Sequence, residues 1–224
     1  MARFRDIIFP ECPYETFEAE KYEGDMQGWS SDHPALKKLV QGLRPELIIE
    51  VGSWKGRSAI NMAKYAAEVG LATEIICVDT WLGSPEHWLN KEDPNFYQSL
   101  KIQNGTPTFY YTFLKNVVDN KLQDVITPFR VPSETAYFIL RRLNIRAKLI
   151  YIDAGHEYES VLNDLNMYTR LLTDDGVICG DDYIMWESVT RAVNEFAVKN
   201  PGFTLIGEKH KFVLGKKISL EYKI

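Results

Sequence analysis

Five acidic residues stand at or near the ends of short apolar runs: Glu50, Asp79, Asp153, Asp181 and Asp182. In an open parallel sheet, ligands bind beyond the carboxyl ends of the strands. Adjacent parallel strands lie about 4.8 Å apart, so carboxylates at their same ends face one crevice. The sequence therefore predicts a ligand site at this edge, in which bound cations balance the acidic charge.

A glycine turn follows the first apolar run, in the segment Glu50-Val51-Gly52-Ser53-Trp54-Lys55-Gly56-Arg57-Ser58. Gly52 permits a tight turn, and Gly56 lets a ligand or the sheet approach the next helix closely. The spacing fits neither the dinucleotide fingerprint nor a phosphate-binding P-loop. Because Glu50 would also repel a phosphate, we expect a cationic ligand.

Asp79 ends the second apolar run, where an acid can accept both hydroxyls of a ribose. Taken alone, such an Asp is often only a turn cap. With the glycine turn, it points to a nucleoside ligand that needs no phosphate, and S-adenosylmethionine fits this description. Trp81 is then a candidate cover for the adenine, and Ser133 a candidate contact at its edge. The full set of cofactor-binding candidates is Glu50, Gly52, Ser53, Gly56, Ser58, Asp79, Thr80, Trp81, Ser133 and Asp153.

Three of the acids, Asp153, Asp181 and Asp182, form a candidate metal site. Two ionised carboxylates about 5 Å apart repel by roughly 3 kcal/mol at an effective dielectric constant of about 20, so a cation or a shared proton is needed. Oxygen ligands of this kind favour Mg²⁺. In the alternative, Asp153 caps the next helix, Asp181 contacts a ligand and Asp182 turns outward.

His156 stands three residues beyond Asp153, at the entrance to a predicted helix. A neutral imidazole there could remove the proton of a metal-held hydroxyl, so His156 and Asp153 are the candidate catalytic residues. A sulfonium methyl group is already activated, which leaves positioning and deprotonation to the protein. In the alternative, His156 only bonds to the backbone.

Apolar runs and helical patterns predict the elements that position these residues. Four runs read as fully buried strands, a fifth is assigned to a sheet edge because Pro128 interrupts it, and the helices alternate with the strands. This order predicts parallel pairing through right-handed crossovers. The predicted strands are 47–51, 74–78, 125–131, 148–152 and 176–179, the helices are 34–43, 57–69, 106–118 and 158–172, and 203–206 with 211–215 form a hairpin.

Two segments do not follow this pattern. Residues 1–30 show no sustained period, and 80–104 holds four aromatic residues among Gly, Pro and acids. We interpret 80–104 as a lid or substrate loop, the alternative being a packed insertion whose aromatic residues seal a small core of their own. Residues 1–224 are expected to form a single domain.

The composition is that of an ordinary globular protein of 224 residues, with 26 basic and 31 acidic residues and a net charge of −5. This balance disfavours a polyanion binder, so no nucleic-acid partner is expected. Five lysines between Lys209 and Lys223 are typical of a solvated face. Without a membrane span or signal sequence, the expected location is cytoplasmic. A homo-oligomer is compatible with the sequence.

Four motifs together resemble class I S-adenosylmethionine-dependent methyltransferases, and within them the small-molecule O-methyltransferases of the macrocin and antibiotic-sugar type. The match extends over roughly residues 30–215. The motifs are Glu50-Val51-Gly52-Ser53 with Gly56-Arg57-Ser58, Val78-Asp79-Thr80-Trp81, Ile152-Asp153-Ala154-Gly155-His156-Glu157-Tyr158, and Gly180-Asp181-Asp182-Tyr183.

The resemblance implies an α/β fold: a Rossmann-like, doubly wound, mostly parallel seven-stranded sheet with an antiparallel C-terminal hairpin. It implies that Glu50, Gly52 and Asp79 hold the cofactor and that Asp153, Asp181 and Asp182 hold Mg²⁺. In macrolide-sugar relatives the base occupies the position of His156, while catechol-type relatives place a lysine at the same offset.

The sequence as a whole predicts a magnesium-assisted O-methyltransferase acting on a hydroxyl of a small molecule, such as a sugar or a glycosylated metabolite. Two alternatives stay open. One is a metal-dependent hydroxylase or hydrolase that uses the same carboxylates, and the other is a non-catalytic protein that only binds the cofactor.

Overall fold

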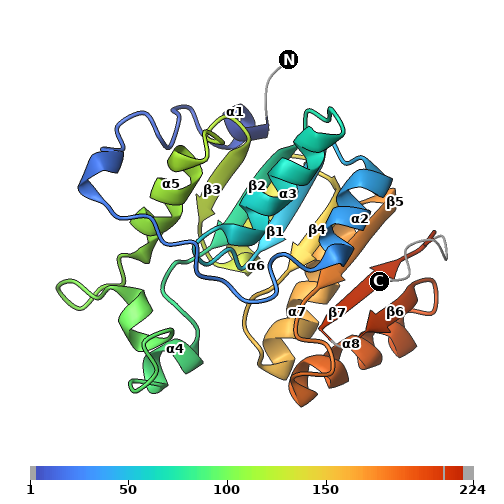
Figure 1. Cartoon of the computed structure of the whole chain (residues 1–224). Coiled ribbons are helices and arrows are strands. Elements are labelled where there is room, and N and C mark those ends of the chain that lie inside the picture. The colour runs from blue at the N-terminus through green and yellow to red at the C-terminus, as the bar shows by residue number, and fades with distance from the viewer. Residues whose placement is uncertain (1–3, 209, 219–224) are drawn as a thin grey trace.

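The computed structural model describes residues 4–208 and 210–218, which build one seven-stranded sheet in the order β3-β2-β1-β4-β5-β7-β6 (Figure 1). The first five strands pair in parallel, and β7 runs antiparallel to both of its neighbours. This confirms the predicted fold class, including the C-terminal hairpin. The strands are β1 (Leu47–Val51), β2 (Glu74–Asp79), β3 (Ile126–Arg130), β4 (Ala147–Ile152), β5 (Leu172–Gly180), β6 (Thr204–Glu208) and β7 (Lys211–Gly215).

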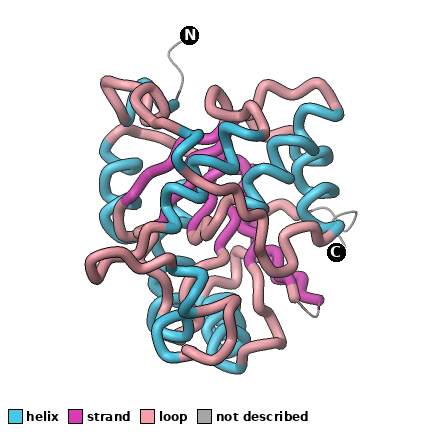
Figure 2. Tube along the Cα trace, turned by 60° about the vertical axis from the view of Figure 1, so that its left-hand side comes forward, coloured by secondary structure: helices cyan, strands magenta, loops and turns pink. Residues whose placement is uncertain are grey.

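Helices cover both faces of the sheet, and the strands run between them through the middle of the molecule (Figure 2). Side chains of α2, α3 and α5 pack on one face, and those of α6, α7 and α8 on the other. The helices are α1 (Phe4–Ile8), α2 (Pro34–Leu43), α3 (Arg57–Glu68), α4 (Pro85–Leu89), α5 (Phe109–Asp119), α6 (Ser133–Arg142), α7 (Tyr158–Tyr168) and α8 (Glu187–Lys199), with 3₁₀ turns η1 (Ala19–Lys21), η2 (Tyr97–Leu100) and η3 (Thr169–Leu171).

Most predicted elements are found within a few residues of their expected bounds. β3 lies at the edge of the sheet, as Pro128 indicated. The predicted helix 158–172 is too long, because α7 ends at Tyr168 and β5 already begins at Leu172. The apolar residues Leu171 and Leu172 continue the helical pattern in sequence but are buried in the turn and the strand instead.

The strand register places the predicted site residues side by side. Val51 pairs with both Val78 and Ile152, and Ile152 pairs with Gly180. The residues that follow these four positions are Gly52, Asp79, Asp153 and Asp181. Asp79 is the last residue of β2, and the other three come directly after the ends of β1, β4 and β5. The prediction that these residues share one edge of the sheet is confirmed.

Two irregular segments lie over this edge. The segment between η1 and α2 crosses the sheet beside the start of α3 (Figure 1). It is anchored there because Asn61 Nδ2 donates to the Ser31 carbonyl and Arg57 Nη1 donates to the Gly28 carbonyl. The 80–104 segment forms α4 and η2. No helix among the described residues is long and apolar enough to cross a membrane.

Gly52 is expected to be indispensable to this edge, since its φ is +83° and a Cβ there would lie 1.9 Å from the carbonyl oxygen of Asp153. Gly52→Ala should lower the free energy of unfolding by at least about 2 kcal/mol, measured by chemical denaturation. Gly70→Ala is the matched control: its φ is +67° but its Cβ meets nothing within 4 Å. It should cost only about 1 kcal/mol. Equal losses in both variants would contradict the predicted clash.

Candidate active site

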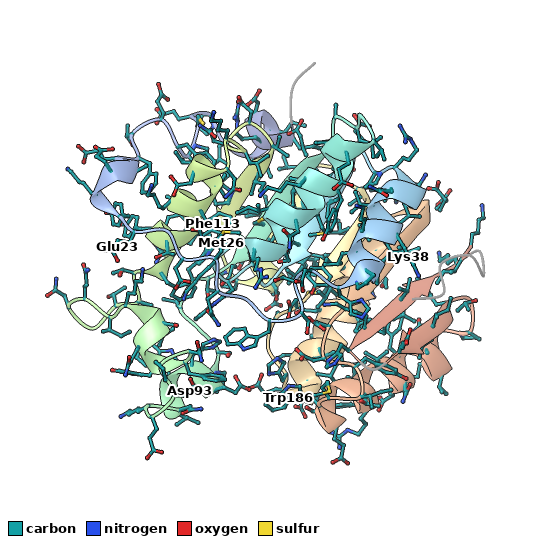
Figure 3. All side chains as sticks on the ribbon, in the orientation of Figure 1. Glu23, Met26, Lys38, Asp93, Phe113 and Trp186 are labelled. Atoms are coloured by element: carbon teal, nitrogen blue, oxygen red, sulfur yellow. The ribbon has the colours of Figure 1, made fainter. Side chains whose placement is uncertain are left out.

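A cavity of about 470 Å³ opens at the carboxyl edge of the sheet. Its wall combines the strand ends with the segment before α2, the 80–104 segment and the residues before α8. Figure 3 labels Trp186, which lines the cavity, and Asp93 of the 80–104 segment, which does not. The predicted site residues that lie in the wall are Gly52, Ser53, Ser58, Asp79, Thr80, Ser133, Asp153, His156 and Asp182.

Two cofactor-binding candidates lie beneath the wall. Glu50 is fully buried inside β1 and accepts a hydrogen bond from Ser58 Oγ at 2.6 Å. Gly56 has a φ of +84° and packs on Phe113, whose ring a Cβ would meet at 2.9 Å. This corrects the prediction that Glu50 and Gly56 contact a ligand, because both stabilise the turn from below.

Trp81 and Asp181 also point away from the cavity. The left-handed φ of Trp81, +51°, directs its ring into the core against Phe113, where Nε1 donates to the Trp54 carbonyl at 2.7 Å. Trp81 therefore does not cover a ligand face, contrary to the prediction. The Asp181 side chain is 5% exposed and faces Lys211.

Asp79 is fixed by backbone donors at the floor of the cavity. Its Oδ2 accepts from the amides of Ser53 and Trp54 at 2.9 and 3.0 Å, and its Oδ1 accepts from Trp81 N at 2.7 Å. Burial raises the pKa of Asp79, although these amide donors favour its ionised form. Asp79 lines the cavity, so its carboxylate can also meet a ligand there.

His156 lies between two carboxylates. Its Nε2 is 2.9 Å from Asp182 Oδ2, its Nδ1 is 3.4 Å from Glu86 Oε1, and its ring stacks on Trp186 at 4.3 Å. In the neutral ring, donation of Nε2–H to Asp182 leaves the lone pair on Nδ1. That nitrogen is buried and makes no hydrogen bond within the described structure. The neutral ring therefore carries a basic atom next to Glu86, on a residue that lines the cavity.

The backbone conformation of Asp182 directs its side chain toward His156. Its φ of +62° is left-handed, which is uncommon for a residue other than glycine. The two adjacent aspartates consequently diverge, with Asp181 directed inward to Lys211 and Asp182 directed to His156 in the cavity wall. The alternative in which Asp182 turns outward is therefore wrong.

The two histidines of the cavity carry opposite pKa shifts. Burial disfavours the charged form of His156, but its hydrogen bond to Asp182 and the charges of Asp182 and Glu86 raise its pKa. Burial lowers the pKa of His87 to about 4. Since Ser84 N donates to His87 Nδ1 at 3.2 Å, the neutral ring carries its proton on Nε2. His87 is thus a donor and His156 a potential base.

A buried lysine lies at the acidic cluster. Lys211 Nζ is 2.5 Å from Asp181 Oδ2 and donates to Tyr151 Oη at 2.7 Å, and the lysine side chain is fully buried. Tyr151 Oη is in turn 3.0 Å from Asp153 Oδ2. Burial and the Asp181 charge raise the pKa of Asp153. Lys211 is therefore an exception to the solvated face expected for the lysines from Lys209 to Lys223, whereas Lys216 and Lys217 are exposed; residues 209 and 219–224 lie outside the described residues.

The residues present do not fit the predicted Mg²⁺. Across residues 4–208 and 210–218, no three His, Cys, Asp or Glu side chains are arranged to hold a metal ion. Asp181 is paired with Lys211 and Asp182 with His156, so neither carboxylate is free to bind a metal together with Asp153. The predicted site with Asp153, Asp181 and Asp182 as ligands is therefore not formed, and the chain supplies a cation of its own, the Lys211 ammonium.

Several wall residues were not predicted. Most of these residues belong to the two irregular segments, which show no helical or strand periodicity. Only the aromatic and ionisable residues in the segments could have indicated that they line a site. The wall also contains Trp54, which is part of the glycine turn, and Trp186. These residues are Gln27, Gly28, Trp29, Trp54, Glu86, His87, Phe96 and Trp186.

Four polar atoms of the wall are buried without a hydrogen-bond partner in the part of the chain that the structure describes, besides Nδ1 of His156. They are Ser31 Oγ, Ser53 Oγ, Glu86 Oε2 and His87 Nε2. Because an unpaired buried polar group is costly, such groups indicate a polar ligand or water. Ser31 and Ser53 lie beside the glycine turn, whereas Glu86 and His87 lie on the 80–104 segment, so the cavity has two polar regions.

Comparison with known proteins identifies the family. Residues 49–183 match the family model described as a methyltransferase domain. The uncharacterised protein y4gI of Sinorhizobium fredii is 24% identical over 154 residues, which cover 69% of this chain and only 15% of that protein.

Two solved structures share the fold. The O-methyltransferase of Bacillus cereus in complex with SAH has a TM-score of 0.59 at 15% identity, covering 84% of this chain and 81% of that one. The O-methyltransferase TomG of Streptomyces achromogenes in complex with SAM has a TM-score of 0.57 at 12% identity, covering 88% and 86%.

NMR titration of the histidine rings should place the pKa of His156 above 6.5 and that of His87 near 4. Asp182→Asn should lower the pKa of His156, because the variant loses the negative charge that favours the imidazolium. Asp174→Asn removes an exposed acid near the opposite end of β5 and should leave both values unchanged. A His156 pKa that is insensitive to Asp182→Asn would contradict the proposed pairing.

Proposed function

Since the chain belongs to the methyltransferase domain family, we propose that it transfers a methyl group from S-adenosylmethionine to a hydroxyl of a small molecule. The observation that carries this proposal is that His156, whose Nδ1 makes no hydrogen bond among the described residues, lines the same cavity as the glycine turn and Asp79. A basic atom beside a nucleoside pocket suits deprotonation of an oxygen nucleophile. The O-methyltransferases of the same fold support the choice of oxygen as the acceptor atom.

The cofactor side of the cavity is the region around the glycine turn. Asp79 lines this region, where a ribose hydroxyl would donate to its carboxylate, and the unpaired Ser31 Oγ fits a polar atom of the amino-acid tail. S-adenosylmethionine, when bound, supplies a methyl group that its sulfonium has already activated. The protein then has to hold the acceptor in line and remove its proton.

His156 performs the proton step in this proposal. The acceptor hydroxyl donates to Nδ1 and transfers its proton there as the oxygen attacks. Asp182, which accepts the proton on Nε2, fixes the tautomer and stabilises the imidazolium that forms. Glu86 at 3.4 Å adds a second negative charge. No step is assigned to a metal ion, because Asp181 and Asp182 are already paired with Lys211 and His156.

The 80–104 segment faces the acceptor. Trp29 and Trp186 line the cavity and are 47% and 40% exposed, so their rings remain available to a ligand. Glu86 Oε2 and His87 Nε2 offer an acceptor and a donor beside them. Aromatic faces with a few placed polar groups suit a ligand with apolar faces and several hydroxyls. This supports a sugar or glycosylated metabolite as the acceptor.

Location and partners are part of the same proposal. A methyltransferase for small molecules that uses a common cellular cofactor would act in the cytoplasm. The three cysteines, Cys12, Cys77 and Cys179, are unpaired in the structure, which agrees with a reducing compartment. No nucleic acid or membrane surface is proposed as a partner.

Asp79→Asn should weaken the binding of S-adenosylhomocysteine by about 10- to 100-fold, because a charge-assisted hydrogen bond to the ribose is lost. Isothermal titration calorimetry measures the effect. Asp93→Asn, which changes an acid outside the cavity wall, is the control and should bind within about twofold of the wild type. Failure of the wild-type protein to bind the compound would contradict the proposed function itself.

His156→Gln should reduce kcat by about 10²- to 10⁴-fold, the usual contribution of a general base, and leave the Kd for S-adenosylhomocysteine nearly unchanged. The assay follows labelled methyl transfer to the best acceptor found in a panel of sugars, glycosides and phenols. His210→Gln, at a histidine outside the cavity wall, should keep full activity. Full turnover by His156→Gln would remove His156 from the mechanism.

A further inference from the structure

Lys211 lies against the acidic cluster, where the sequence predicts a divalent cation. It is the first residue of β7, and β7 pairs with β5, after which Asp181 and Asp182 follow. Its ammonium is fully buried, 2.5 Å from Asp181 Oδ2. A buried lysine is stable only when its charge is paired and its protons are bonded. Asp181 and Tyr151 Oη meet both requirements.

Tyr151 extends this contact to Asp153. Its hydroxyl accepts from Lys211 at 2.7 Å and lies 3.0 Å from Asp153 Oδ2 and 3.2 Å from Asp181 Oδ2. The hydroxyl has one proton, and Asp181 Oδ2 is already paired with the ammonium. Donation to Asp153 is therefore favoured, which gives a continuous link from Lys211 through Tyr151 to the cavity wall.

This network competes directly with a metal ion. The second oxygen of Asp181 accepts from the Asp182 amide at 2.9 Å, so each of its oxygens already has a partner. A divalent cation bound to Asp181 would lie close to the buried ammonium and be repelled by it. The metal could bind at the cluster only if Lys211 lost its proton or left its site.

We propose that Lys211 replaces the divalent cation of the acidic cluster, so that the enzyme works without a bound metal. Lys211 does not line the cavity, and we assign it as a positioning residue that holds Asp181 directly and Asp153 through Tyr151. The inference rests on the proposed O-methyltransferase activity only for its turnover prediction. Its prediction about metal binding is independent of any activity.

The first test measures Mn²⁺ binding to the purified protein by electron paramagnetic resonance, with metal content determined by mass spectrometry. Wild-type protein should bind Mn²⁺ only substoichiometrically, and its turnover should be unchanged by EDTA. Stoichiometric binding of Mn²⁺, or turnover that EDTA abolishes and Mg²⁺ restores, would overturn the inference while leaving the methyltransferase proposal intact. Conversely, a protein that binds neither Mn²⁺ nor S-adenosylmethionine would overturn the proposed function and support the inference.

Variants of Lys211 make the test specific. Lys211→Met removes the ammonium and frees the carboxylates, so this variant should gain a Mn²⁺ site and be stabilised by Mg²⁺ in thermal unfolding. Lys217→Met, which changes an exposed lysine of the same chain region, should gain neither property. Lys211→Arg keeps the positive charge and should stay free of metal.

A double variant covers the case in which Lys211→Met does not fold. Lys211→Met combined with Asp181→Asn removes both members of the ion pair and leaves no unpaired buried charge. It should fold and bind no Mn²⁺. Rescue of the single variant by Mg²⁺ but not of the double variant would support the inference, whereas equal Mn²⁺ binding by wild type and Lys211→Met would overturn it.

Discussion

Carboxylates gathered at one edge of a parallel sheet repel one another, and the rest of this site depends on how that repulsion is cancelled. The register brings Asp79, Asp153 and Asp181 level with one another. Each charge is then compensated by the chain itself: backbone amides hold Asp79, and Lys211 holds Asp181. Asp182 accepts a hydrogen bond from His156, and this contact also orients the proposed base.

The sequence predicted those features that depend on local pattern. The apolar run Leu47–Val51 is buried throughout, and similar runs located the other parallel strands, so the residues that follow them could be assigned to one edge. The sequence did not predict whether an individual side chain points into the cavity or into the core. Trp81 turns into the core through a left-handed φ, and Glu50 lies inside its strand instead of at its end.

The partner of the acidic cluster could not be predicted either, for a topological reason. Lys211 meets Tyr151 across a sequence separation of 60 residues, and only the antiparallel return of β7 beside β5 brings them together. In sequence, Lys211 is one of several lysines near the end of the chain. The contribution of the covering segments to the cavity could not be predicted either. Residues such as Trp29 and Glu86 lie in segments that show no helical or strand periodicity in the sequence.

In the proposed enzyme, one cavity holds the cofactor and the base so that a methyl group can pass to an oxygen near His156. A crystal structure of the complex with S-adenosylhomocysteine tests it most directly. We predict density with the ribose hydroxyls at Asp79, the sulfur facing Nδ1 of His156, and Lys211 still bound to Asp181. A ligand bound outside this cavity, or a sulfur directed away from His156, would contradict the proposed placement of the cofactor and the base.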